Sequence, residues 1–131
     1  MTATEPGTTP RRKVLLVDDS AITHTWVRMI LDRSEYDMVS ARDGQEGVEV
    51  ALAELPDLIL MDVVMPRMDG FEACRVLRGH RATCGIPIVM VTTRAEARSV
   101  EAGFASGCSD YVTKPIDGLE LLSKVRSFLG E

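Results

Sequence analysis

Acidic residues end two of the hydrophobic runs in this chain. Asp18 and Asp19 close the run VLLVDDS, and Asp62 follows LILM in LILMDVVMPRMDG. If the two runs form neighbouring parallel strands, their three carboxylates meet at one edge of a sheet. Two such charges about 4 Å apart repel by roughly 4 kcal/mol at an effective dielectric near 20, so the group needs a cation or a proton. We therefore interpret these acids as a functional site, although Asp also ends strands as an ordinary turn or N-cap residue.

The side chains that follow the other apolar runs suggest what this site handles. Carboxylates without clustered His or Cys select Mg²⁺, with Mn²⁺ possible, and bound Mg²⁺ often shares a phosphate oxygen. An ionised Asp62 can attack phosphorus in line. Thr92 and Thr93 follow the fourth run, and Lys114 with Pro115 follows the fifth. The hydroxyl of Thr92 and the ammonium of Lys114 complement phosphoryl oxygens.

Strand and helix patterns alternate along the chain and position these side chains. Five mainly apolar runs predict strands, at Val14 to Val17, Met38 to Ala41, Leu58 to Met61, Ile88 to Val91 and Tyr111 to Val112. The second run is more mixed, which is typical of an edge strand. Five βα units with short links wind right-handedly into an open parallel sheet covered on both faces. The prediction is an α/β fold with a doubly wound five-stranded parallel sheet.

Apolar residues at helical spacing fill the gaps between these strands. We interpret each stripe as core packing; the stripes are Ile22, Trp26, Ile30; Val48, Leu52, Leu55; Phe71, Cys74, Leu77; Ala97, Val100, Phe104; and Leu121, Val125, Phe128. Asp43 with Glu46 and Asp117 with Glu120 predict helix starts at which Asp accepts from a backbone amide. Gly107 and Gly130 suit helix ends.

Composition limits the possible classes of protein. The 131 residues suit one domain, and a net charge of −5 argues against a nucleic-acid or anionic-membrane surface. Residues 1–12 are expected to form a disordered tail before a domain at 13–131. No apolar run is long enough to span a membrane, so we expect a cytoplasmic protein. The chain ends directly after the last helix, which predicts a stand-alone domain without an output module.

Several residues receive a structural interpretation. The odd number of cysteines predicts free thiols and not a zinc site. His24 and His80 lack acidic or cysteine neighbours at ligand spacing, so both are expected on the surface. The methionines are expected to fill gaps in the core, and Trp26 to pack; the methionines concerned are Met61, Met65 and Met90.

Taken together, the motifs resemble the receiver domain of bacterial two-component response regulators over about Lys13 to Leu129. The similarity rests on VLLVDDS, MDVVMPRMDG, IVMVTT and YVTKP in this order and spacing. It implies a flavodoxin-like, CheY-like (βα)5 fold with strand order 2-1-3-4-5. It also implies Asp62 as phosphoacceptor, with Asp19 and the backbone carbonyl of Val64 binding Mg²⁺ and Asp18 holding the metal through water.

The resemblance extends to switching and partners. It implies that Lys114 and Thr92 sense the phosphate, that a cis peptide joins Lys114 to Pro115, and that Thr92 and Tyr111 move on phosphorylation. The expected output face comprises the fourth helix, the fifth strand and the fifth helix. Expected partners are a sensor histidine kinase or histidine phosphotransfer protein and a downstream protein, with no direct nucleic acid and no membrane insertion. The domain would be a monomer or a phosphorylation-dependent dimer, and not an enzyme beyond its own phosphorylation and dephosphorylation.

Two departures from the family pattern predict a long-lived phosphoryl group. Val64 cannot hydrogen-bond an attacking water, and Thr93 is bulkier than the small residue often found there. Nearby Arg94 is a candidate partner contact, and Gly103 suggests a pliable fourth helix or close packing.

The alternatives to a stand-alone receiver are a receiver excised from a transcription factor or signalling enzyme, and a phosphorylation-independent pseudo-receiver. An aspartate-nucleophile phosphatase resembles DxDx(T/V) after the first strand, which this chain lacks. A flavin-binding module would need a phosphate loop where this chain has DDS.

Overall fold

The computed structural model describes residues 11–32, 36–93 and 105–130. Its strands are β1 (Lys13–Val17), β2 (Asp37–Ala41), β3 (Leu58–Asp62), β4 (Ile88–Thr92) and β5 (Asp110–Thr113). Its helices are α1 (Ala21–Asp32), α2 (Gly44–Glu54), α3 (Gly70–Arg78) and α5 (Gly118–Leu129). The strands pair in parallel in the order β2-β1-β3-β4-β5. The predicted doubly wound sheet and its strand order are confirmed.

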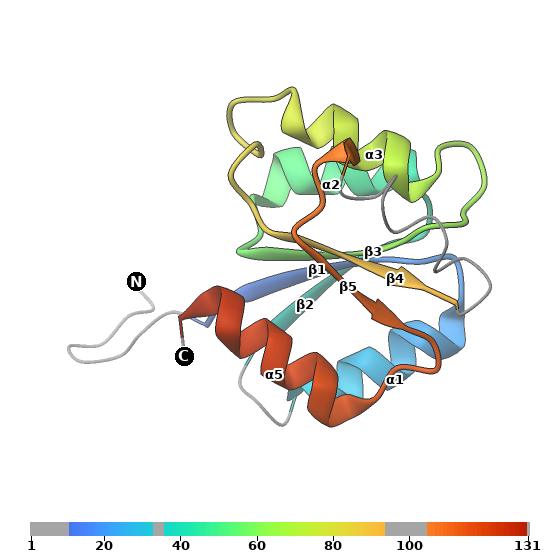
Figure 1. Ribbon diagram of the computed structural model, residues 1–131, viewed down its shortest axis with the longest axis vertical. Helices are drawn as coiled ribbons and strands as arrows, with labels where there is room; N and C mark the ends of the chain where they lie inside the picture. The colour runs from blue at the N-terminus through green and yellow to red at the C-terminus, as the bar shows by residue number, and fades with distance from the viewer. Residues whose placement is uncertain (1–10, 33–35, 94–104, 131) are drawn as a thin grey trace, which may run out of the picture.

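Helices cover both faces of the sheet (Figure 1), with α2 and α3 on one side and α1 and α5 on the other. A hydrophobic cluster lies on each face of the sheet, and alternate residues of β1 pack into one or the other. Val14 and Leu16 pack in the cluster that contains residues of α1 and α5, whereas Leu15 and Val17 pack in the cluster of α2 and α3. Burial on both faces explains why the central strands are continuous apolar runs.

The observed strands extend the predicted runs by no more than one residue at either end. Asp62 and Thr92 are consequently the last residues of β3 and β4, while Asp18 and Lys114 directly follow β1 and β5. The mixed run forms β2 at one edge of the sheet, as expected. All the chemically interesting strand ends therefore lie at the carboxyl edge of one sheet.

Aspartate side chains cap three helices. Asp43 Oδ1 accepts from the amide of Glu46 at 2.8 Å, and Asp117 Oδ1 accepts from the amide of Glu120 at 3.1 Å, as predicted. Asp69 caps α3 in the same way through the amide of Glu72, at 2.9 Å, and the same Asp-x-x-Glu spacing was available in the sequence. Gly130 ends α5 with a φ of 77°, and Gly107 follows two helical residues with a φ of 105°.

The predicted buried stripe of α1 is partly wrong. Ile22 is 82% exposed and Trp26 is 42% exposed, whereas His24 is only 6% exposed. The buried face of α1 instead comprises His24, Val27, Ile30 and Leu31. Apolar residues occur on both possible faces of this helix, so periodicity alone could not choose its rotation about its axis.

The other stripes pack largely as predicted, apart from Leu55. It lies beyond the last residue of α2, has a φ of 48° and is 52% exposed. Chain reversal at the helix end turns this side chain away from the core. The predicted stripe Ala97, Val100 and Phe104, together with Gly103 and Arg94, lies outside the described residues.

Residues 1–10 of the predicted tail also lie outside the described residues. The last two tail residues contact the sheet: Arg11 pairs with Asp37 at 2.9 Å, and the Arg12 carbonyl accepts from the Asp37 amide at 2.9 Å. All three cysteines are free, as predicted. Among the described helices, none combines the length and the apolar character needed to cross a membrane.

Candidate functional site at the carboxyl edge of the sheet

Three carboxylates converge where β1 and β3 end. Asp18, Asp19 and Asp62 each offer an oxygen, and these oxygens lie within 4.8 Å of one another. Asp18 is 0% exposed and Asp62 is 6% exposed, whereas Asp19 is exposed. The parallel pairing of β1 with β3 brings the ends of the two strands together. The sequence-predicted acidic site therefore exists as a single cluster.

Lys114 brings one positive charge to this cluster. Its Nζ lies 3.0 Å from Asp18 Oδ2 and 3.6 Å from Asp62 Oδ2. Burial by itself lowers the pKa of Lys114, but hydrogen bonding and charge from Asp18 and Asp62 outweigh burial and raise it above its ordinary value. Lys114 is thus held as a cation, and it offsets only part of the charge of three carboxylates.

One oxygen of the Asp18 carboxylate is buried beside a cation that it shares. Asp18 Oδ1 accepts from the Ser20 amide at 2.7 Å, whereas Oδ2 is buried and has only the Lys114 ammonium beside it, at 3.0 Å, an ammonium that it shares with Asp62. A buried anionic oxygen of this kind is costly unless a cation or donor completes its environment. Hard oxygen donors in excess over positive charge fit Mg²⁺. The residues present therefore suit the metal that the resemblance implies.

The turn after β3 depends on a glycine. The Gly70 amide donates to the Val63 carbonyl at 2.9 Å, which folds the chain back at the start of α3. A Cβ at Gly70 would lie 2.2 Å from the Asp62 carbonyl oxygen, so no other residue fits without displacing the backbone. The final glycine of MPRMDG is thereby explained. Val64, within this turn, is 63% exposed.

Thr92 and Lys114 are joined through the backbone. The Lys114 amide donates to the Thr92 carbonyl at 2.7 Å, which continues the pairing of β4 with β5. The Thr92 side chain is buried, and its Oγ1 donates to the Thr93 carbonyl at 3.2 Å. Tyr111, on β5, is 37% exposed. The peptide bond between Lys114 and Pro115 is cis, at the position that the resemblance indicated.

His24 contradicts its predicted surface location, whereas His80 is exposed as predicted. The buried His24 ring lies between two polar groups: Nε2 is 2.7 Å from the Asp18 carbonyl, and Nδ1 is 3.2 Å from Ser40 Oγ. Ligand spacing could not reveal this histidine, because it contacts a backbone atom of the site. The useful signal was its helical spacing with Val27 and Leu31, which form the true buried stripe.

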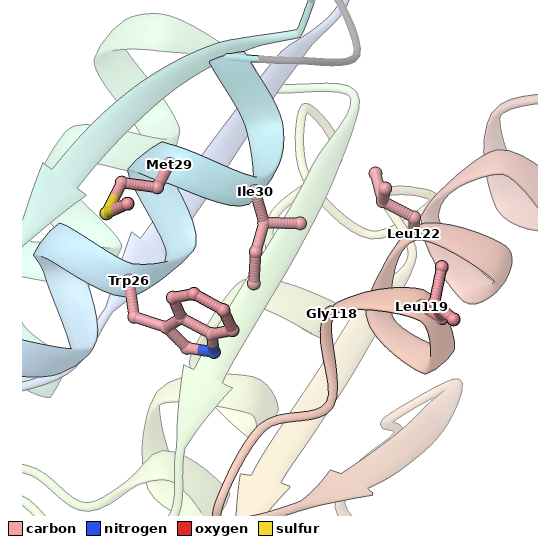
Figure 2. Close-up of a pocket in the computed structure, with 6 residues that line it drawn as sticks. All are labelled: Trp26, Met29, Ile30, Gly118, Leu119 and Leu122. Carbon is pink, nitrogen blue, oxygen red and sulfur yellow. The ribbon is translucent and has the colours of Figure 1, made fainter.

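An apolar groove lies between α1 and α5. Figure 2 shows Trp26 and Ile30 of α1 on the side toward Gly118 and Leu119 of α5; Met29 and Leu122 also line the groove. A second hollow adjoins it at Trp26 and reaches Lys114 and Pro115; its other lining residues are Ile22, Thr23 and Ile116. Trp26 also donates its indole N–H to the Ile116 carbonyl at 2.9 Å. The predicted packing role of Trp26 is therefore partial, since its side chain connects α1 to the turn before α5 and stays 42% exposed.

Comparison with known proteins decides the family. The model of the response regulator receiver domain matches residues 14–126. The chain belongs to this family. It is thus a receiver domain of two-component response regulators, which supports a phosphoacceptor role in signalling.

Relatives of this receiver domain differ in length. The chain is 38% identical over 117 residues to the DNA-binding dual master transcriptional regulator RpaA of Synechocystis sp., covering 89% of this chain and 48% of that protein. It is 36% identical over 117 residues to protein PilH of Pseudomonas aeruginosa, covering 89% of this chain and 97% of that protein. The chain therefore spans about half the length of the first curated relatives it matches, and nearly all of PilH.

A solved structure provides the clearest comparison for the metal. The receiver domain of the sensor histidine kinase PA1611 from Pseudomonas aeruginosa PAO1 has a TM-score of 0.86 and 29% identity to this chain. The match covers 93% of this chain and all of that chain. That structure has a magnesium ion coordinated in its active-site cleft.

Proposed function

We propose that this receiver domain accepts a phosphoryl group on Asp62 in a Mg²⁺-dependent reaction and then controls a partner protein. The observation that carries the proposal is the convergence of three carboxylates and one lysine at the carboxyl edge of the sheet. Such an excess of buried negative charge opposes folding unless a ligand makes use of it. The magnesium site of the PA1611 receiver domain supports the same reading of the cluster.

Each residue has a defined role in this proposal. Asp19, Asp62 and the backbone carbonyl of Val64 would hold Mg²⁺ directly, and Asp18 would hold it through water. When bound, the metal neutralises charge on the carboxylates and on the incoming phosphoryl oxygens. Mn²⁺ has the same preference for oxygen ligands and would substitute.

The proposed chemical step is an in-line transfer from a phosphohistidine or a small phosphodonor. A carboxylate oxygen of Asp62 forms a bond to phosphorus, and the bond from phosphorus to the donor atom breaks with its electron pair remaining on the donor. Lys114, already 3.6 Å from Asp62 Oδ2, would pair with a transferred oxygen. The domain would thus catalyse only its own phosphorylation and dephosphorylation.

Signalling would follow from a rearrangement at the strand ends. Thr92 Oγ1 donates to the Thr93 carbonyl in the described structure and would turn to donate to the new phosphoryl oxygen. Tyr111 is partly exposed on β5 and would turn inward as Thr92 moves. The face affected would comprise β5, α5 and the fourth helix expected at residues 97–104, which lies outside the described residues.

The proposed partners are a sensor histidine kinase or histidine phosphotransfer protein upstream and a protein target downstream. The match with PilH covers 97% of that protein, so a receiver domain of this kind also occurs without a long further segment. RpaA, about twice as long, favours the alternative of a receiver within a larger regulator. Phosphorylation would leave the domain monomeric or drive its dimerisation.

The test is the intact mass of the protein after incubation with acetyl phosphate, with and without Mg²⁺. Wild-type protein is expected to gain one phosphoryl group only when Mg²⁺ is present, and Asp62→Asn is expected to gain none. Glu54→Gln is the matched control, because it removes a carboxylate at the opposite edge of the sheet, where Glu54 pairs with Lys13 at the start of β1. An unmodified but folded wild type would favour the pseudo-receiver alternative, and an adduct on Asp62→Asn would exclude Asp62 as the acceptor.

We also propose that the turn after β3 sets the lifetime of the phosphoryl group. Val64 presents an apolar side chain that is 63% exposed and cannot orient water by hydrogen bonding. Val64→Asn is expected to accelerate loss of the phosphoryl group by about tenfold, less than the roughly 10²- to 10⁴-fold that a general acid or base contributes, because an amide orients water but does not take up its proton. The decay of the phosphorylated protein is followed by mass, with Val64→Leu as the apolar control. Equal decay of the Asn and Leu variants would contradict the role assigned to this position.

A further inference from the structure

The peptide bond between Asp18 and Asp19 is the base from which two of the three acidic side chains of the site project. Since a peptide unit is planar, the direction of the Asp18 carbonyl also sets the direction of the Asp19 amide. A rotation of this plane would move both carboxylates. The contacts of the Asp18 carbonyl are therefore important for the geometry of the site.

His24, in the first turn of α1, contacts the peptide plane between Asp18 and Asp19. Its Nε2 lies 2.7 Å from the Asp18 carbonyl oxygen, and because a carbonyl oxygen only accepts, Nε2 donates the hydrogen. The Asp18 amide donates to the Ala41 carbonyl of β2 at 3.1 Å. Asp18 is thus fixed on both of its backbone sides, by β2 and by α1.

The ring of His24 is itself held in place. Its Nδ1 lies 3.2 Å from the hydroxyl oxygen of Ser40 on β2, and the residue is 6% exposed. A buried imidazole with polar partners at both nitrogens has little freedom to rotate. The same two elements, β2 and α1, therefore fix both the ring and the peptide that it contacts.

We propose that His24 is a positioning residue for the metal site, which holds the Asp18–Asp19 peptide in the orientation that Mg²⁺ binding requires. The inference rests on the proposed function, since it assigns a role at the same site. His24 contacts no metal ligand atom: it acts on the backbone that carries the carboxylates. Partners that orient metal ligands in this indirect way typically change metal affinity by about 10- to 100-fold when they are removed.

Two substitutions separate positioning from simple loss of packing. The side-chain nitrogen of Gln is separated from Cβ by the same number of bonds as Nε2 of His, so His24→Gln can still donate to the Asp18 carbonyl. The nitrogen of Asn corresponds to Nδ1 instead, so His24→Asn can reach Ser40 but not Asp18. Both variants lose the aromatic ring and its packing.

The measurement is calorimetric titration of each protein with MgCl₂ in the absence of phosphodonor, together with urea unfolding without metal. His24→Asn is expected to bind Mg²⁺ about 10-fold more weakly than wild type, and His24→Gln within about twofold of wild type. The two variants are expected to lose similar stability to urea. The Mg²⁺ affinity would then depend on the hydrogen bond to the Asp18 carbonyl and not on the stability of the domain.

Other outcomes would overturn the role of His24. Equal Mg²⁺ affinity in wild type and His24→Asn would do so, as would equal weakening in the Asn and Gln variants. If His24→Asn does not fold, His24→Phe replaces it, because Phe keeps a ring in the same place but cannot donate to the Asp18 carbonyl; unchanged affinity there would overturn the proposal. Failure of wild type itself to bind Mg²⁺ would instead overturn the proposed function on which the inference depends.

Discussion

Charged side chains are arranged differently at the two edges of the sheet, the amino edge where the strands begin and the carboxyl edge where they end. At the amino edge each acid faces a base on the surface: Lys13 Nζ lies 2.9 Å from Glu54 Oε1, and Arg11 Nε lies 2.9 Å from Asp37 Oδ1. These four side chains are 37% to 58% exposed. At the carboxyl edge Lys114 pairs with both Asp18 and Asp62, Asp19 belongs to the same cluster, and Asp18 is fully buried.

The difference shows which charges serve folding and which require a ligand. Exposed, matched pairs contribute little to stability, because water screens them and long side chains lose freedom in forming them. A cluster of three carboxylates with one lysine keeps an excess of negative charge, which opposes folding until a further cation binds. The charges at the amino edge are therefore balanced within the protein, whereas those at the carboxyl edge are balanced only when a cation binds.

The largest expected difference between the two edges is in the response to Mg²⁺. At a Mg²⁺ concentration 100 times the dissociation constant, binding to the native state should stabilise wild type by about 2.7 kcal/mol. Asp18→Asn should lose most of this gain, while Glu54→Gln, which also removes one negative charge, should retain it. Thermal unfolding of the three proteins with and without MgCl₂ measures the effect. A full gain in Asp18→Asn would mean that Asp18 is not part of the metal site.

Removal of the cation that pairs with the acidic cluster should have the next largest effect. Lys114→Met removes the ammonium that pairs with Asp18 and Asp62 and is expected to destabilise the metal-free protein by about 2 kcal/mol at neutral pH. Because the folded-state pKa of Lys114 is raised, its stabilisation is fully present below its ordinary pKa of 10.5 and is lost as pH rises through the folded value.

The check is the unfolding free energy in urea as a function of pH. The difference between wild type and Lys114→Met should shrink above pH 10.5. Addition of Mg²⁺ at neutral pH should also reduce this difference, since the metal supplies the missing positive charge. A difference that stays constant at high pH would indicate that lost packing, and not charge, explains the substitution.

The smallest effect should come from the amino edge. Glu54→Gln removes the partner of Lys13 Nζ, and both side chains are exposed, so the unfolding free energy should fall by about 0.5 kcal/mol or less. The loss should diminish further in 1 M salt, where charges are screened within about 3 Å. Urea unfolding at low and high salt measures it. A loss comparable to that of Lys114→Met would remove the distinction between the two edges.

Much of the fold and of the candidate site could be predicted from local patterns. The strands were found to within one residue at either end, because burial on both faces produces continuous apolar runs. The cap residues Asp43 and Asp117 act on amides only a few positions away. The acids and Lys114 were found because each adjoins the end of a predicted strand.

The orientation of α1 could not be predicted in the same way. Its sequence carries apolar residues on more than one face, so the stripe through Ile22 and Trp26 competed with the stripe through Val27 and Leu31. Contact with the sheet selected the second stripe and buried His24. As a result Trp26 lines the groove toward α5 (Figure 2), and Ile22 lines the adjoining hollow that reaches Lys114.

The sequence by itself determined which elements form, in which order, and which side chains stand at their ends. These properties depend on backbone preferences and on hydrophobic periodicity, which act over a few neighbouring residues. Only the tertiary structure decided that the oxygens of Asp18, Asp19 and Asp62 lie within 4.8 Å of one another, that Lys114 lies 3.0 Å from Asp18, and that His24 donates to the Asp18 carbonyl. These contacts join segments from different elements, so they depend on strand pairing and helix rotation, which the packing of the whole domain sets.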